Sequence, residues 1–149
     1  MTEAKLDAAL RLRFGDAAPA PAAIADDPAL ARLAARGAAR AYADAPVDPA
    51  LIDALCAIAL SAPTKSDLQQ RDVIQIREPA LRATIDAQLP EAEWAKAAPV
   101  LLVFCGNNAR QRRLHALRGR PFANDHFDAP FNAACDAAVA MAFFIAAAA

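Results

Sequence analysis

Glycine is scarce in this sequence, which contains 4 glycines and 11 prolines among 149 residues. Alanine is by far the commonest residue, and it favours helices while burying little surface per side chain. Scarce glycine argues against a β-sandwich, and a hydrophobic fraction of 57% argues against a disordered chain. The composition therefore predicts a helix-rich globular protein of about one domain.

An excess of charge is also missing, because 16 basic residues balance 17 acidic residues to a net charge of −1. A chain so close to neutrality has no overall field that attracts nucleic acid or an anionic membrane. The three cysteines, Cys56, Cys105 and Cys135, lie far apart in apolar surroundings. Without paired spacing they indicate neither a metal site nor a disulfide framework, and we expect small core residues.

Several common enzyme motifs are absent from the sequence: the P-loop, GxGxxG, the nucleophile elbow and HExxH. A signal-peptide stretch is absent too, since Lys5, Asp7 and Arg11 interrupt the N-terminal segment. The long apolar segment near the C-terminus contains Asp136, which keeps it below membrane-spanning length. We therefore expect a cytoplasmic protein without a membrane partner, whose chemistry belongs to a cofactor and to no catalytic side chain.

Two Asp-Pro pairs mark helix starts, at Asp27-Pro28 and Asp48-Pro49. Each pair combines an N-cap carboxylate with a proline at the first helical position. The first of these helices is expected to reach about Arg36 and to end at Gly37, and the second to end before Pro63. A buried stripe is predicted along the second helix, formed by Leu51, Ile52, Leu55, Ile58 and Ala59. Other helices are expected over residues 3–14, 79–89, 110–117 and from 131 onward.

Short apolar runs at residues 73–76 and 100–105 predict two strands separated by a helix. This order predicts an α+β fold with a central sheet flanked by helices. The second run does not alternate with polar residues, so we expect that strand to be covered on both faces. We interpret residues 1–23 as an N-terminal helix with an Ala/Pro connector, and residues 24–149 as one domain.

Two segments carry candidate ligand-binding chemistry. Arg36 and Arg40 place two guanidinium groups four residues apart, and such groups bind phosphate through charge-assisted hydrogen bonds. The alternative is a solvated pair at a helix C-terminus, where cations are favourable. The second segment, residues 61–69 (SAPTKSDLQ), is a polar loop between an apolar helix and a strand. Together the two segments predict a site for a phosphorylated ligand that also forms hydrogen bonds.

The order of these segments resembles the FMN-dependent nitroreductase superfamily, and most of all its NADPH-linked flavin reductase branch. The resemblance runs from Arg36 to Ala149 and rests on Arg-x-x-x-Arg-x-Tyr, SAPTxSxLQ, EPALR, APVLLVFC and the Ala-rich closing helix. It implies an intertwined homodimer with FMN at the subunit interface, and a chain without the family's last third. It further implies an FMN-dependent NAD(P)H oxidoreductase that reduces nitroaromatics, quinones or flavins by a ping-pong mechanism.

The resemblance also implies roles for particular residues. It assigns the FMN phosphate to the segment of Arg36, Gly37, Ala38 and Arg40. It assigns the flavin ring to the loop residues Thr64, Lys65, Ser66, Asp67 and Gln69. Lys65 either stabilises reduced flavin as a positioned cation or is an ordinary exposed lysine. Three residues depart from the family: Ala38 replaces a serine, Asp67 replaces asparagine or an apolar residue, and Arg71 replaces a frequent tryptophan.

The aromatic residues and the arginines between residues 110 and 127 each allow two interpretations. Phe122 and Phe127 either form the wall of a planar substrate site or attach their loop to the core. The arginines of this stretch either grip the 2′-phosphate of NADPH or form a solvated basic face, and the solvated face is favoured. Neither His115 nor His126 has a metal-ligand partner nearby in sequence, and we expect Trp94 to be a packing residue.

Two other functions remain open from the sequence. The chain is alternatively a non-catalytic flavin-binding or dimerisation module of the same fold. A weaker alternative is a small nucleic-acid-binding protein that uses residues 110–120, against which the near-neutral charge argues. The closing helix is too apolar to face water, so it predicts an interface with a second copy.

Overall fold

The computed structural model describes residues 5–123 and 125–149. It divides into two compact units, Lys5–Ala39 and Arg40–Ala148. The sequence suggested a boundary after residue 23, whereas the contacts divide the chain sixteen residues later. The reason is that the helix after Asp27 packs against the first helix of the chain.

The first unit is a pair of packed helices, α1 (Leu6–Phe14) and α2 (Pro28–Ala35), with a 3-10 turn η1 (Gly15–Ala17) after α1. Asp27 caps α2 as predicted, because its carboxylate accepts the N–H groups of Ala29 and Leu30 at 2.9 and 3.1 Å. Leu6, Ala9 and Ala31 are buried in this unit. Helix α2 ends at Ala35, slightly before the predicted end.

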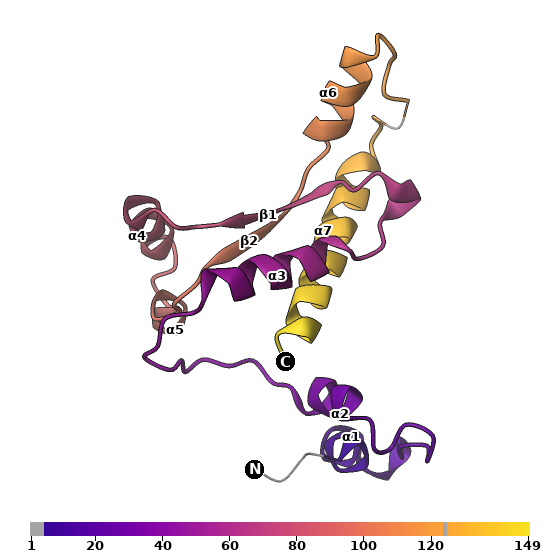
Figure 1. Cartoon of the computed structure of the whole chain (residues 1–149), viewed down its shortest axis with the longest axis vertical. Helices are drawn as coiled ribbons and strands as arrows, with labels where there is room; N and C mark the ends of the chain where they lie inside the picture. Colours follow the sequence, from indigo (N-terminus) through magenta and orange to yellow (C-terminus); the bar gives the residue numbers. More distant parts are fainter. Residues whose placement is uncertain (1–4, 124) are drawn as a thin grey trace. The chain divides into compact units, whose positions relative to one another are not determined.

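The second unit is helix-rich with one small sheet (Figure 1). The strands β1 (Arg71–Gln75) and β2 (Leu102–Gly106) pair antiparallel, with Arg71 opposite Gly106. This confirms the α+β class. The remaining elements are α3 (Pro49–Leu60), the 3-10 turn η2 (Lys65–Asp67), α4 (Pro79–Ala87), α5 (Glu93–Lys96), α6 (Ala109–Leu117) and α7 (Ala129–Ala147).

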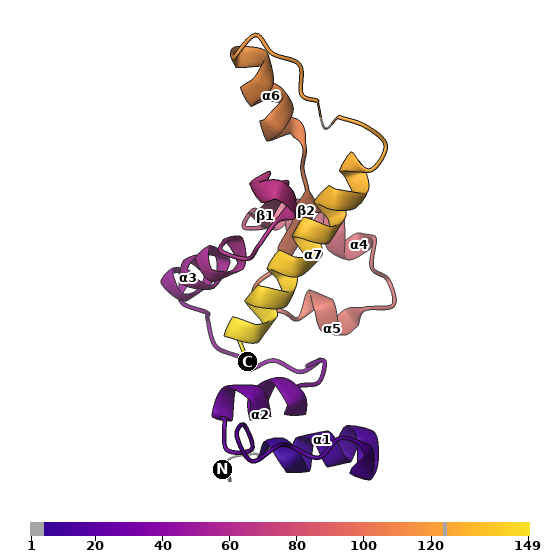
Figure 2. The ribbon, with the colours of Figure 1, turned by 90° about the vertical axis from the view of Figure 1, so that its right-hand side faces the viewer.

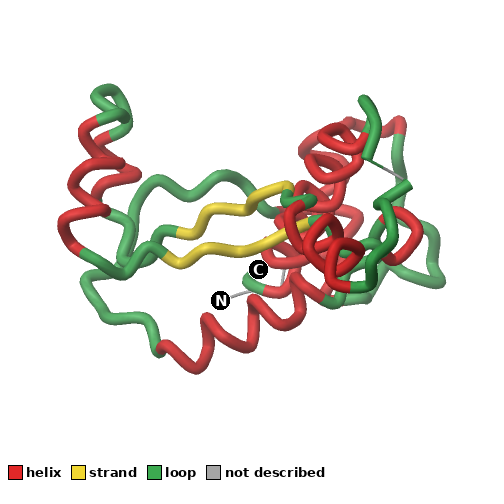
Figure 3. The backbone as a smooth tube through the Cα atoms, turned by 90° about the horizontal axis from the view of Figure 1, so that it is seen from above, coloured by secondary structure: helices red, strands yellow, loops and turns green. Residues whose placement is uncertain are grey.

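Helix α7 lies across the sheet and against α3 (Figures 1 and 2). The two strands run side by side in Figure 3, and α4 and α5 lie at the end of the sheet opposite to α6 (Figure 1). Gly106 permits close contact between β2 and α7, because a Cβ atom there would lie 2.8 Å from the carbonyl carbon of Ala133. The ring of Phe104 meets that of Phe144 edge-on, with 5.7 Å between centroids.

The core of this unit is small and rich in alanine. It is formed by Ile52, Leu55 and Ala59 of α3 together with Ala129, Ala133, Ala137 and Ala140 of α7. The predicted stripe on α3 is wrong at two positions, since Leu51 and Ile58 are exposed. The prediction that β2 is covered on both faces is also wrong, because its residues are half-buried or exposed. Among the residues described, α7 is the helix that packs on the strands, and α3 packs against α7. Cys135, expected in the core, is exposed.

The side chain of Arg71 caps the C-terminal end of helix α3. This side chain is 3% exposed, and its Nη2 donates hydrogen bonds to the carbonyls of Leu60 and Ala62 at 2.6 and 2.8 Å. The last carbonyls of a helix have no partner inside the helix, so a guanidinium here satisfies them. The helix stops at Leu60, three residues before Pro63.

Helix α7 is long and apolar enough, by length and composition alone, to cross a membrane. Its sequence contains one charged residue, Asp136, whose side chain is buried at 3% exposure. The same face carries the buried alanines that pack on the sheet and α3. We therefore interpret α7 as the core helix of this unit.

Candidate functional site

The loop from Ser61 to Gln70, between α3 and β1, has an unusual backbone. Ser66, Asp67 and Gln69 have φ angles of 51°, 53° and 50°. This left-handed region is uncommon for residues other than glycine, and each such residue costs of the order of 1 kcal/mol. The loop keeps this conformation only because contacts elsewhere hold it.

Asp136 of α7 holds both ends of the strained segment. Its Oδ1 accepts the N–H of Lys65 at 3.0 Å, and its Oδ2 accepts the N–H of Gln70 at 3.2 Å. From the sequence alone, Asp136 is expected only to interrupt an apolar segment, and this role is not predicted. The available signal was a lone carboxylate inside an otherwise apolar helix, which must find hydrogen-bond donors when it is buried.

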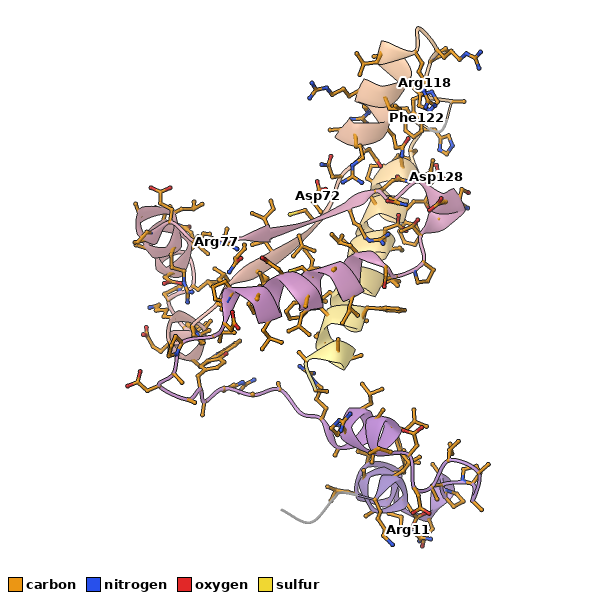
Figure 4. All side chains as sticks on the ribbon, viewed as in Figure 1. Arg11, Asp72, Arg77, Arg118, Phe122 and Asp128 are labelled. Atoms are coloured by element: carbon orange, nitrogen blue, oxygen red, sulfur yellow. The ribbon has the colours of Figure 1, made fainter. Side chains whose placement is uncertain are left out.

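Helix α6 holds the C-terminal part of the loop. Gln111 donates from Nε2 to the carbonyl of Leu68 at 2.6 Å, and Arg110 donates from Nη1 to the carbonyl of Gln69 at 3.2 Å. Arg110 also pairs with Asp72 at 2.7 Å, and Figure 4 shows Asp72 on β1. A pocket of about 190 Å³ lies here, lined by Leu60, Gln69, Arg71, Asp72, Val73 and Arg110.

The predicted flavin-loop residues are brought together by these contacts. The Gln69 N–H donates to the Thr64 hydroxyl at 3.3 Å, and the Gln69 side-chain amide donates to Asp67 at 3.1 Å. The Asp67 carboxylate therefore forms a hydrogen bond within the loop. The side chains of Lys65, Ser66, Asp67 and Gln69 are exposed. Within the described residues, Lys65 forms no ion pair.

The arginine segment is divided between the two units. Arg36, Gly37 and Ala38 belong to the first unit and Arg40 to the second. The carbonyl of Arg36 accepts a hydrogen bond from Arg13. The guanidinium of Arg40 lies 5.7 Å from the ring centroid of Trp94. Convergence of Arg36 and Arg40 with the loop on one ligand stays a prediction.

In the stretch after β2, some side chains contact other residues and others are exposed to solvent. Arg112 forms two hydrogen bonds with Asp125, at 2.9 and 2.6 Å, and these hold the pKa of the Asp125 carboxyl below its ordinary value. Phe122 lies against His115, with 5.1 Å between ring centroids, beside α6 in Figure 4. Phe127 is completely exposed. Phe122 therefore attaches its loop to α6.

Solved structures with the same arrangement were found, although a scan of protein families and a search of curated proteins each found no match. NfrA2 of B. megaterium has a TM-score of 0.75 at 22% identity, over 80% of this chain and 49% of its own. The NfrA1 nitroreductase of B. subtilis has a TM-score of 0.74 at 20% identity, over 80% and 49%. An NADPH:FMN oxidoreductase from Vibrio harveyi, solved with NAD+, has a TM-score of 0.64 at 16% identity, over 76% and 47%.

The chain spans about half the length of the solved structures that it matches. The shared arrangement of helices around a small antiparallel sheet agrees with the resemblance found in the sequence. The chain therefore has the nitroreductase fold.

Proposed function

We propose that the protein is an FMN-dependent NAD(P)H oxidoreductase. The observation that carries the proposal is the strained loop from Thr64 to Gln69, which presents exposed polar side chains and is held by α6 and α7 in a nitroreductase fold. Strained backbone concentrates at ligand sites, where the surrounding structure maintains it. The V. harveyi protein of the same fold is an NADPH:FMN oxidoreductase.

The residues present fit FMN by their chemistry. In the part of the chain that is described, Arg36 and Arg40 form no ion pair, so their guanidinium groups are available for a phosphate. We assign the phosphate to Arg36 and Arg40, with Gly37 and Ala38 leaving room beside it. The amide of Gln69 has a carbonyl oxygen to accept from the flavin ring, while its nitrogen already donates to Asp67.

When bound, FMN would supply the redox chemistry of hydride acceptance from NAD(P)H and electron transfer to an acceptor. The residues of the chain would bind and orient it, and Lys65 would supply a positive charge for electrostatic stabilisation of the reduced flavin. We assign no general acid or base. We propose nitroaromatics, quinones or flavins as acceptors in a ping-pong mechanism, with Phe127 available to a planar substrate.

We also propose a cytoplasmic homodimer. Large apolar side chains are exposed on both helices of the core, among them Leu51 and Ile58 of α3 and Met141 and Phe143 of α7. Exposed apolar surface of this extent is typical of an interface. A second copy would cover it.

The test is flavin titration followed by turnover. We expect the purified chain to quench FMN fluorescence on binding and to oxidise NADPH when a quinone is present. Arg40→Ala should weaken FMN binding by about tenfold, which corresponds to ~1.4 kcal/mol. The matched control is Arg77→Ala, at an exposed arginine beyond β1 that pairs with Asp53 at 3.6 Å and donates to the Gln75 side chain at 2.8 Å. An unquenched titration would refute the proposal.

A second candidate is a non-catalytic flavin-binding module. The observation that favours it is the Asp67 carboxylate, which departs from the family's residues and already accepts the Gln69 side-chain amide, together with Ala38 in place of a serine. The two candidates separate in one assay, since the module binds FMN without oxidising NADPH or NADH in the presence of any acceptor.

A further inference from the structure

Asp136 combines burial, charge and a defined set of partners. It is the only charged residue in the sequence of α7, and its side chain is 3% exposed. A buried carboxylate is costly unless hydrogen bonds compensate its charge. Here the compensation comes from two backbone N–H groups, one on each carboxylate oxygen. The demand of the carboxylate for donors therefore ties the loop to the core helix.

The two donors bracket the strained segment. Lys65 precedes and Gln70 follows the three residues with positive φ. Relaxation of those residues to ordinary φ values would relieve strain, but it would also pull one or both N–H groups away from Asp136. The contacts from α6 cannot replace this, because they reach only the C-terminal end of the segment, at the carbonyls of Leu68 and Gln69, and leave the N–H of Lys65 to Asp136.

We infer that Asp136 is a positioning residue that holds the loop in its ligand-binding conformation before a ligand arrives. This inference rests on the proposed function. A protein whose competent conformation is only fractionally populated binds with a dissociation constant raised by the inverse of that fraction. Loss of Asp136 should therefore weaken FMN binding, although both carboxylate oxygens of Asp136 already accept backbone N–H groups of the loop.

The first experiment compares Asp136→Asn with Asp128→Asn. Both variants replace an aspartate of the α7 region by asparagine. Asp128, however, is exposed and precedes α7 as its N-cap residue. We expect the FMN dissociation constant, measured by fluorescence quenching, to rise about tenfold or more in Asp136→Asn, as the competent fraction falls to about one tenth. Asp128→Asn should bind like the unchanged chain.

Amide hydrogen exchange in the flavin-free chain separates positioning from general stability. In Asp136→Asn, the amides of Lys65 and Gln70 should exchange faster, while those of the β1–β2 ladder keep their rates. A residue needed only for overall stability would accelerate both sets together, since global unfolding exposes every amide.

The second experiment leaves Asp136 in place and removes one donor. Lys65→Pro deletes the N–H that Asp136 accepts, and Lys65→Ala is the matched control that keeps it. Thr64 has φ −135° and ψ 159°, which suits a residue before proline. We expect Lys65→Pro to bind FMN several-fold more weakly than Lys65→Ala. This pair decides the question if Asp136→Asn does not fold.

The outcomes distinguish this inference from the proposed function. If the unchanged chain does not bind FMN, the proposed function fails, and amide exchange alone tests the positioning role. Unchanged exchange at Lys65 and Gln70 in Asp136→Asn overturns the inference. So does an Asp136→Asn variant that binds FMN as tightly as the unchanged chain, or equal affinities in the two Lys65 variants.

Discussion

At the scale of single residues, the buried polar groups Arg71 and Asp136 shape this unit. Both satisfy backbone groups that no regular element pairs: Arg71 the carbonyls of Leu60 and Ala62, Asp136 the N–H groups of Lys65 and Gln70. Arg71 holds the start of the loop and Asp136 holds its middle and its end, so the loop between α3 and β1 is fixed by side chains that come from outside it.

Replacement of Arg71 by methionine should lower the free energy of unfolding by about 2–3 kcal/mol, because two buried carbonyls lose a charged donor. Removal of the unpartnered Nε and Nη1 groups offsets part of the loss. Urea denaturation measures the change. Arg77→Met, which removes an exposed arginine at the other end of β1 (Figure 4), should change stability by about 0.5 kcal/mol or less. Equal effects in the two variants would contradict this account of Arg71.

A second prediction at this scale concerns the carboxyl of Asp125. Hydrogen bonds from Arg112 lower its pKa in the folded chain relative to the unfolded chain. Its contribution to holding the loop is therefore present above the unfolded pKa and is lost as the pH falls through the folded pKa. We expect Arg112→Gln to raise the Asp125 pKa towards its ordinary value in an NMR titration. The pKa of Asp7, lowered by the hydrogen bond from Arg11, should not move; a shift at both sites would indicate a general effect.

At the scale of secondary structure, the contact between α7 and β2 decides how the unit packs. Small residues allow it: Gly106 faces Ala133, and the buried face of α7 consists mainly of alanine. Close approach of backbones then takes the place of large interlocking side chains. The helix accordingly leaves its larger apolar side chains, such as Met141 and Phe143, exposed.

Gly106→Ala should destabilise the chain by about 2–3 kcal/mol, because the added Cβ would lie 2.8 and 2.9 Å from backbone atoms of Ala133 and α7 would have to shift. Thermal unfolding followed by circular dichroism measures the loss. Gly37→Ala is the matched control for stability, since a Cβ there meets no atom within 4 Å. A Gly106→Ala variant as stable as the unchanged chain would show that α7 does not rest on β2 this closely.

At the scale of the whole molecule, the exposed apolar side chains of α3 and α7 are the basis of the proposed homodimer. We expect a dimer in sedimentation velocity at micromolar concentration. Phe143→Asp should raise the dimer dissociation constant at least about tenfold, since a carboxylate would be buried without a partner. Leu117→Asp, at an exposed end of α6, should leave the dimer intact. A soluble monomer in the unchanged chain would rule out the proposed homodimer.

The sequence by itself determined the features that depend on nearby residues. The helix starts at Pro28 and Pro49 were predictable because an aspartate caps N–H groups only two or three residues further on. The strands and the α+β class followed from apolar runs, and the ordered motifs indicated the nitroreductase fold. These signals depend on residues close together in the sequence, so they can be interpreted without knowledge of the three-dimensional arrangement.

Only the tertiary structure decided which distant groups meet. Asp136 reaches N–H groups 71 and 66 residues earlier in the chain, and Gln111 reaches Leu68 across 43 residues. Leu51 and Ile58 matched the pattern of a buried stripe but are exposed, because α7 covers a narrower face of α3. Periodicity shows which side chains share a face of a helix; how much of that face is covered depends on the elements that pack against it.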